Sequence, residues 1–242
     1  QAAKNPDVDF AIVDEFVEAP NVKPIVFDTA QAAYLAGYLA AGVSQTGKVA
    51  TFGGGNQPPV TLFMDGFVDG VAKYNEVHGT AVVALGWDKA TQDGVFTGDF
   101  EDINKGLTTA QAFIDQGADV ILPVAGQVGE GPARAALDSG TASIIWVDSD
   151  GYDTLSPDFR PVLLTSVLKN TGSAVVEIVK TSIDDTFDNA PFIGTLENGG
   201  VGIAPFHDLA PRVSAELSAE IDQLRSDIVA GTIVVTSPST PR

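Results

Sequence analysis

Short apolar runs alternate with longer segments of helical spacing along almost the whole chain. The runs are rich in residues that favour strands, and they are too short for helices. This alternation predicts an α/β fold with a mostly parallel sheet covered by helices. Strands are expected at residues 10–13, 25–27, 48–52, 81–85, 120–124, 144–147 and 163–167.

Between the strands, apolar residues recur three and four positions apart, so each segment carries one apolar stripe. We interpret the stripes as core-facing and keep Phe63 also as a candidate ligand contact. The stripes are Tyr34, Leu35, Tyr38, Leu39 and Val43; Phe63, Phe67, Val71 and Tyr74; Ile103, Leu107, Ala110, Phe113 and Ile114; Ala174, Val175, Ile178 and Val179; and Val213, Leu217, Ile221, Leu224 and Ile228.

A glycine follows four of the predicted helices. Gly47, Gly117, Gly140 and Gly231 stand where a helix is expected to end. Helices often end on a residue in the left-handed conformation, which glycine adopts without a steric penalty. Several helix-to-strand turns are therefore expected to share one design.

Size and composition indicate a folded chain without thiol chemistry. The 242 residues allow one large domain or two lobes, since domains commonly hold about 100–200 residues. Hydrophobic residues make up 44% and charged residues 19%, a balance that allows burial to offset the entropy lost on folding. With no cysteine, disulfides, thiolate metal sites and thiol nucleophiles are excluded.

The chain is strongly acidic. Thirteen Lys and Arg against 32 Asp and Glu give a formal net charge of −19. Such a charge repels phosphate backbones and anionic membrane surfaces, so we expect no nucleic-acid partner. We interpret the charge as a solvated exterior.

The first residues have the pattern of the end of a helix and a turn before the first strand. No charged and then apolar signal segment opens the chain, and no apolar run approaches the roughly 18 residues that span a bilayer. We therefore expect a segment upstream of Gln1 that carries any targeting signal.

Three loops that follow predicted strands are candidate ligand contacts, because open α/β sheets bind ligands beyond the carboxyl ends of their strands. They span residues 53–59, 125–131 and 148–152. The first two are rich in glycine and precede helices, which allows close approach of the backbone to a ligand. Neither has the spacing of a phosphate-binding motif. Tight turns with nothing bound are the alternative.

The third loop carries two carboxylates, Asp148 and Asp150. A carboxylate at a strand end can accept hydrogen bonds from the vicinal hydroxyls of a ribose, which suggests binding of a polyol. The alternative is that one of the two caps the following turn and the other is solvated.

Catalytic and metal-binding patterns are missing from the sequence. His78 and His207 lie far apart and neither belongs to a zinc motif, so no metal site and no cofactor are expected. Ser149 stands between two aspartates rather than in a nucleophile elbow. We therefore expect a binding protein and not an enzyme.

Taken together, several stretches resemble the basic membrane protein (BMP) family of ABC-transporter substrate-binding lipoproteins, which includes bacterial purine nucleoside receptors. The likeness covers nearly the whole chain in order. The stretches are residues 10–14 (FAIVD), 19–22 (APNV), 34–37 (YLAG), 48–54 (KVATFGG), 63–67 (FMDGF), 116–121 (QGADVI), 147–150 (VDSD), 164–169 (LTSVLK) and 197–202 (ENGGVG).

The resemblance implies a type I periplasmic-binding-protein fold, in which two Rossmann-like lobes joined by a hinge enclose the ligand. It places residues 1–28 in the first lobe and residues 29–150 in the second. Residues 151–242 would hold the crossover, the rest of the first lobe around residues 164–185, and the C-terminal helix. The family ordinarily has a further βαβ portion before this start, so the first lobe is expected to be incomplete at its N-terminus.

Carried over by position, Asp148, Gly126, Gln127 and Lys169 resemble the family's polar contacts to a sugar, with Asp150 as a second carboxylate. The alternative for Lys169 is a salt bridge across the hinge.

Three positions depart from the family pattern. Asn56 stands where Asp is usual, and Gln127 stands where a second Gly is usual. Leu122 stands where an aromatic residue often stacks on a base, which weakens the preference for purines. Trp87 and Phe63 are candidates to supply the stacking instead.

By this resemblance, the expected function is that of an extracytoplasmic solute-binding protein of an ABC importer. Its ligand would be a nucleoside, with purines favoured, and its partners the transporter's permease subunits. A monomer held at the bacterial cell membrane by a lipid on the upstream segment is expected. A ligand-sensing module of a receptor or regulator is the first alternative, and a Rossmann-type enzyme acting on sugars or nucleotides is the second.

Overall fold

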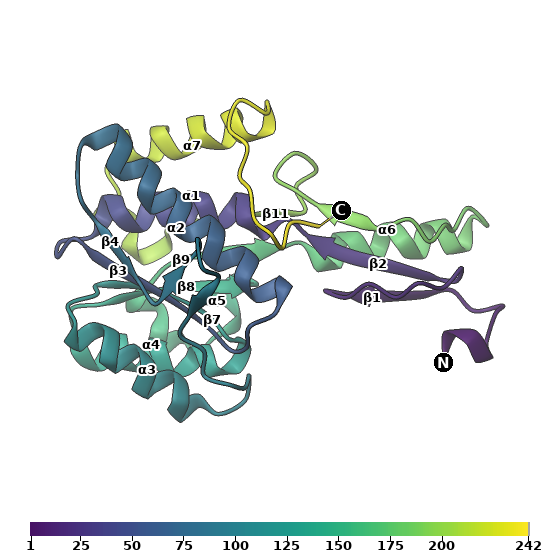
Figure 1. Cartoon of the computed structure of the whole chain (residues 1–242), viewed down its shortest axis with the longest axis horizontal. Helices are drawn as coiled ribbons and strands as arrows, with labels where there is room; N and C mark the ends of the chain where they lie inside the picture. Colours follow the sequence, from purple (N-terminus) through teal and green to yellow (C-terminus); the bar gives the residue numbers. More distant parts are fainter. Residues whose placement is uncertain (242) are drawn as a thin grey trace.

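The computed structural model describes residues 1–241, which form a large body and a narrower arm (Figure 1). The body is built on a six-stranded sheet and the arm on a three-stranded sheet. The chain begins in the arm, and a C-terminal segment returns to the junction between the two. This mixed α/β architecture confirms the fold class expected from the sequence.

The six-stranded sheet has the order β11-β9-β8-β7-β3-β4. Neighbouring strands are parallel, except that β11 runs antiparallel to β9. A two-stranded hairpin, β5 (Trp87–Asp88) and β6 (Asp93–Gly94), follows the edge strand. The six strands are β3 (Lys48–Gly53), β4 (Val83–Leu85), β7 (Val120–Val124), β8 (Ser143–Asp148), β9 (Leu163–Lys169) and β11 (Val201–Ile203).

Helices cover both faces of this sheet. α1 (Thr29–Val43), α2 (Pro58–His78) and α7 (Ala215–Val229) lie on one face, and α3 (Ile103–Asp115) and α4 (Glu130–Ser139) lie on the other (Figure 1). Alternate residues of a strand pack into the hydrophobic cores on the two faces of the sheet. Val49 packs against the core with α1, α2 and α7, and Ala50 against the core with α3 and α4. Strands buried on both faces explain why these runs are apolar at nearly every position.

The contact between α1 and α2 depends on small residues. A Cβ atom on Gly66 of α2 would lie 2.2 Å from the carbonyl oxygen of Ala30, and one on Gly37 of α1 would lie 2.0 Å from that of Phe67. Glycine therefore lets the two helix backbones touch, which no larger residue at these positions would allow.

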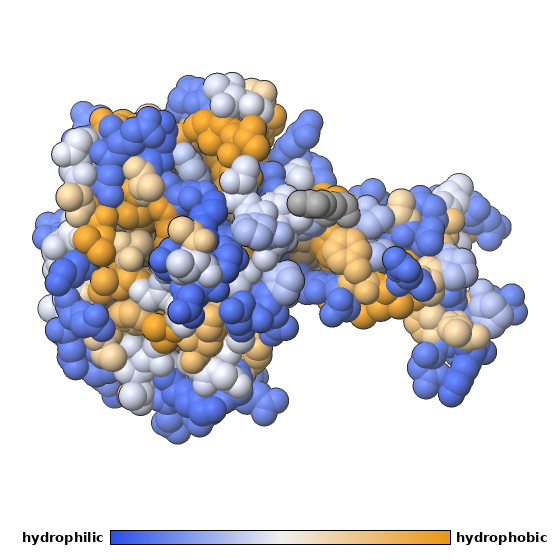
Figure 2. Space-filling view, viewed as in Figure 1, coloured by the Kyte–Doolittle hydropathy of each residue, from blue (hydrophilic) through white to orange (hydrophobic). Residues whose placement is uncertain are grey.

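The arm consists of β1 (Phe10–Val13), β2 (Val22–Phe27) and β10 (Phe192–Gly194), all parallel, and helix α6 (Thr171–Ile183). Several apolar side chains of the arm are exposed, among them Phe16, Val176 and Ile183. Figure 2 shows apolar surface along the arm between its polar ends. The arm therefore buries much less of its apolar surface than the body does.

The C-terminal segment after α7 runs along α2 to the junction of body and arm (Figure 1). Its Ser237 hydroxyl donates to the buried carboxylate of Asp65, at 2.6 Å. Lys89 donates to the carbonyl of Thr236, and the hydroxyls of Ser239 and Thr61 lie 2.8 Å apart. The segment is thus held to α2 through Asp65 and Thr61, and to the turn after β5 through Lys89.

Short helices complete the chain. They are α5 (Gly151–Thr154) and the 3-10 helices η1 (Ala2–Lys4), η2 (Gly126–Gly129), η3 (Pro157–Val162) and η4 (His207–Arg212).

The seven predicted strands are all present, with ends that differ by up to three residues. Gly117, Gly140 and Gly231 follow helices with positive φ, as expected. Gly47 also has positive φ but lies in the turn before β3, because α1 already ends at Val43. Hairpin strands β5 and β6 and strands β10 and β11 were not predicted.

One segment lies elsewhere than expected. The sequence placed the residues around Leu164 in the first lobe, but β9 pairs with β8 along its length and belongs to the body. The chain leaves the body only after Lys169, where α6 begins the return to the arm. The division into lobes at residues 28 and 150 stays a prediction.

Candidate functional site

Two adjoining cavities lie at the junction of body and arm. The smaller, which we call the polar cavity, has a volume of about 350 Å³ and is lined by Phe63, Gly126, Asp148 and Lys169 among others. The larger, which we call the proline cavity, has a volume of about 570 Å³. Both are lined by Asp14, Glu15, Gln57 and Pro59, so they form one continuous cleft.

A lysine between two carboxylates forms the centre of the polar cavity. Lys169 Nζ lies 2.7 Å from Asp14 Oδ2 and 3.1 Å from Asp148 Oδ1. Asp14 follows β1 of the arm, whereas Asp148 ends β8 of the body. The salt bridge that was the alternative interpretation of Lys169 is therefore present, and it connects body and arm directly.

The three charged side chains differ in their access to solvent. Only 7% of the Lys169 side chain is exposed, against 32% for Asp14 and 55% for Asp148. The ammonium group also lies 5.2 Å from the ring centroid of Phe63, within the range of a cation–π contact. Lys169 is thus fixed, while Asp148 keeps oxygen lone pairs open to a ligand hydroxyl.

Both carboxylates stand on left-handed backbone. Asp14 has φ 61° and Asp148 has φ 69°. For a residue other than glycine, such a conformation costs of order 1–3 kcal/mol and persists only where the surroundings hold it. Strand pairing on one side and the Lys169 contact on the other hold these two residues.

The two glycine-rich loops meet at the ring of Phe100. A Cβ atom on Gly54 would lie 2.4 Å from this ring, and one on Gly126 would lie 3.8 Å from it. Phe100 itself lines the polar cavity. Gly54 therefore leaves room for the aromatic ring, whereas a Cβ atom on Gly126 would make only an ordinary van der Waals contact with it.

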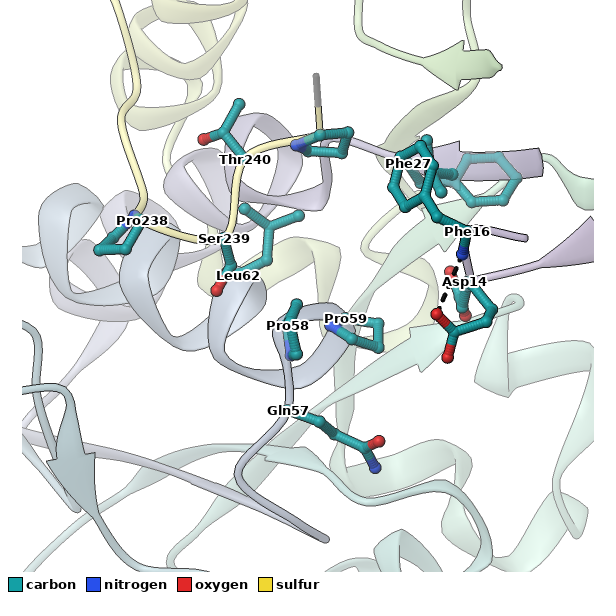
Figure 3. A pocket seen from close by; sticks show the side chains of 13 residues that line it. Asp14, Phe16, Phe27, Gln57, Pro58, Pro59, Leu62, Pro238, Ser239 and Thr240 are labelled. Carbon is teal, nitrogen blue, oxygen red and sulfur yellow. Dashed lines mark hydrogen bonds between the residues drawn. The ribbon is translucent and has the colours of Figure 1, made fainter. Parts of the chain in front are cut away.

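The proline cavity is mostly apolar (Figure 3). Pro58, Pro59 and Leu62 of α2 face Phe16 and Phe27 of the arm. The C-terminal segment closes one side with Pro238, Ser239, Thr240 and Pro241. A cleft with apolar walls and a few converging polar groups is the usual form of a small-molecule site.

Four of the predicted site residues meet in the polar cavity: Phe63, Gly126, Asp148 and Lys169. Asn56 and Gln127 are exposed beside it but do not line it. In the first glycine-rich loop, Gln57 lines the polar cavity in place of Asn56.

Three further candidates lie outside the cleft. Leu122 has no exposed surface and packs in the core beneath α1 and α2. Trp87 is also buried, and its indole N–H donates to Asp65 Oδ1 at 2.8 Å. Asp150 caps α5, which is the alternative role given above for one of the two aspartates, and it also contacts His207. None of the three lines the cleft.

Sequence reasoning missed Asp14, Phe100 and the C-terminal prolines. Asp14 could have been found, since it follows a predicted strand just as Asp148 does. Phe100 lies in a loop without periodicity, and the prolines reach the cleft only through tertiary packing, so no local pattern marks them.

Within residues 1–241, no group of three or more His, Asp or Glu side chains is placed to hold a metal ion. In the same residues, none of the helices has the length and apolar character needed to cross a bilayer.

A cleft between two connected α/β units is the arrangement of solute-binding proteins with a periplasmic-binding type I fold. The chain belongs to the Bmp family, described as ABC transporter substrate-binding protein PnrA-like, whose sequence profile it matches over residues 1–239.

Relatives agree with this membership. The ABC transporter nucleoside-binding protein BmpA of Lactococcus lactis subsp. cremoris is 29% identical over 98% of this chain, and basic membrane protein A of Borreliella burgdorferi is 31% identical over 98%. The chain spans 66% of the length of each.

Among solved structures, an ABC transporter solute-binding protein from Aeropyrum pernix K1 superimposes with a TM-score of 0.83. The match covers 98% of this chain and 73% of that one, at 23% identity, and it shows the shared fold.

Proposed function

We propose that this substrate-binding protein takes up a nucleoside, with purines favoured, in the cleft between body and arm. The observation that carries the proposal is the Asp14, Lys169 and Asp148 cluster, which joins the two units at the cleft. The name of the Lactococcus lactis relative, a nucleoside-binding protein, supports the same ligand class.

The two cavities suit the two halves of such a ligand. Asp148 offers carboxylate oxygens to sugar hydroxyls, and the ammonium of Lys169 offers a donor to a hydroxyl or ring oxygen. The proline cavity, walled by Phe16, Phe27 and prolines, suits a planar heterocycle. A nucleoside has both parts in one molecule.

The charge of the cleft favours a neutral ligand. Asp14, Glu15 and Asp148 line the polar cavity with Lys169 as their one cationic neighbour. A phosphate group brought there would face three carboxylates at short range, which is unfavourable. We therefore expect nucleosides to bind more tightly than nucleotides.

Binding would act through closure of the arm on the body. A ligand that contacts both units stabilises the closed arrangement in proportion to its differential affinity for it. In an ABC importer, the permease subunits would bind this closed state. We propose an extracytoplasmic location with a lipid anchor upstream, a monomeric state, and binding without turnover.

A calorimetric panel tests the ligand class. Adenosine, guanosine, inosine, uridine, ribose and AMP are titrated into the purified protein, and mass spectrometry of the mixtures checks that no ligand is altered. Nucleosides are expected to bind, with AMP at least about tenfold weaker. Binding of AMP as tight as that of adenosine, or no binding of any nucleoside, would contradict the proposal.

A further inference from the structure

A second cluster of polar and aromatic side chains lies directly behind the cleft, on the loop that carries Asp148. His207 Nε2 lies 2.7 Å from Asp150 Oδ2, two residues along the chain from Asp148. The His207 and Tyr152 rings stack with centroids 4.1 Å apart and an interplanar angle of 13°. The cluster therefore ties η4 to the turn after β8.

Asp150 organises this turn. Its Oδ1 accepts a hydrogen bond from the backbone N–H of Tyr152 at 3.1 Å, which caps α5. The buried hydroxyl of Ser166 on β9 accepts from the N–H of Gly151 at 3.0 Å and lies 3.4 Å from Asp150 Oδ1. With His207 on the other oxygen, both carboxylate oxygens of Asp150 are engaged.

Further contacts surround the stacked rings. The guanidinium of Arg160 lies 4.2 Å from the centroid of the Tyr152 ring, and its Nε donates to the Tyr152 carbonyl at 3.1 Å. The Tyr152 hydroxyl donates to Asp208 at 3.0 Å, and this bond, together with burial, raises the pKa of Tyr152. His207 has φ 41°, a strained backbone conformation for a residue with a side chain.

The same stretch of chain reaches the cleft from the arm. After β10, strand β11 pairs antiparallel with β9, with Val201 opposite Lys169, and then continues to His207. The loop of Asp148 is thus held at two points. Lys169 contacts its first residue, and His207 contacts its third.

We propose that His207 is a positioning residue for ligand binding. Through Asp150, it fixes the strained turn that presents the Asp148 carboxylate to the polar cavity. The ligand in this inference is the nucleoside of the proposed function. The positioning role of His207 follows from the contacts of the loop. It assigns Asp150 a role behind the site rather than a contact with the ligand.

The other histidine provides a matched control. His78 Nε2 lies 3.0 Å from the carboxylate of Glu220, and its ring stacks on Tyr74 with centroids 4.3 Å apart. This pair joins α2 to α7 and does not line the cleft. His78→Ala therefore removes the same kinds of contact without touching the Asp148 loop.

The experiment compares His207→Ala, His207→Gln and His78→Ala in two measurements. Hydrogen exchange of the amides of residues 149–155 is followed without ligand, and adenosine affinity is measured by calorimetry. His207→Ala is expected to speed exchange in the loop and to weaken adenosine binding, each about tenfold. His207→Gln, which keeps an N–H donor for Asp150, is expected to recover most of both. His78→Ala is expected to change neither.

Each outcome decides the proposal. Unchanged loop exchange in His207→Ala overturns it, and so does faster exchange with full adenosine affinity. An equal loss of affinity in His78→Ala would assign the effect to general stability and overturn it as well. If the unmodified protein binds no adenosine, the nucleoside proposal fails, and loop exchange alone decides whether His207 holds the turn.

Discussion

At the scale of single residues, the cleft depends on carboxylates whose surroundings differ. Asp148 is half exposed and ion-paired, so it can exchange part of its hydration for ligand hydroxyls. Asp28, at the junction of β2 and α1, is buried, and its Oδ1 has no hydrogen-bond partner in residues 1–241. Asp148 is therefore accessible to a ligand. Asp28, in contrast, lies where burial disfavours its charged form.

Replacing Asp148 by Asn is expected to weaken nucleoside binding by about tenfold or more, because one acceptor oxygen and its charge are lost. Calorimetry with adenosine measures the change. Asp138→Asn is the control, since the Asp138 side chain is 54% exposed against 55% for Asp148 and is likewise ion-paired, to Arg134. Equal affinities of the two variants would remove Asp148 from the site.

Burial raises the pKa of Asp28, and the hydrogen bond from Gln31 lowers it by less. The folded state therefore binds this proton more tightly than the unfolded state does. The stability that the proton contributes is complete below the ordinary pKa and is lost as pH rises through the raised, folded pKa. Asp28→Asn has no such loss. The free energy of unfolding of Asp28→Asn, relative to the unmodified protein, is thus expected to rise between pH 3.5 and pH 7 in urea titrations. A difference that stays constant with pH would contradict this assignment.

At the scale of elements, the burial and the length of a strand decide whether it can be predicted from the sequence. β3, β7 and β8 are apolar because helices cover both their faces, so their runs are visible locally. The strands of the hairpin have two residues each, and β10 and β11 have three, which leaves few positions for a periodic pattern. β4 also has three residues, but it ends a longer apolar run at residues 81–85 that made it visible. β10 and β11 pair with strands that are distant in the sequence, β2 and β9.

The glycine contact between α1 and α2 predicts a marked difference between two identical substitutions. Gly66→Ala would drive a methyl group into the backbone of Ala30 and is expected to cost about 1–3 kcal/mol of stability. Gly172→Ala, at the start of α6 with open space around it, is expected to gain up to about 1 kcal/mol. Denaturant unfolding measures both. A stable Gly66→Ala variant would show that the helices separate without cost.

At the scale of the whole molecule, position beyond a strand end did not by itself decide which residues line the cleft: Asp148 and Gly126 do, whereas Asp150 and Gln127 in the same loops do not. Asp148 and Gly126 were predicted because they follow predicted strands, and Lys169 was carried over from the family pattern. Leu122 was chosen for its position in the family pattern, but it lies two residues deeper in β7 than Val124, which does line the cleft. Two residues along a strand span about 7 Å, enough to move a side chain from the cavity into the core.

Closure of the arm is expected to make the molecule more compact. In small-angle X-ray scattering, saturating adenosine should lower the radius of gyration of the unmodified protein, because a ligand held by both units stabilises their approach. Asp148→Asn at the same adenosine concentration should show a smaller decrease. An unchanged radius with adenosine bound would indicate that the arm is already in its final position.

The C-terminal segment offers a position at which a fluorescent dye can be attached beside the cleft. Pro238 lies on the wall of the proline cavity, and the chain contains no cysteine. A Pro238→Cys substitution would therefore create a unique attachment point for an environment-sensitive dye beside the ligand. The labelled protein would then report its own occupancy as a change in emission colour, without a labelled ligand.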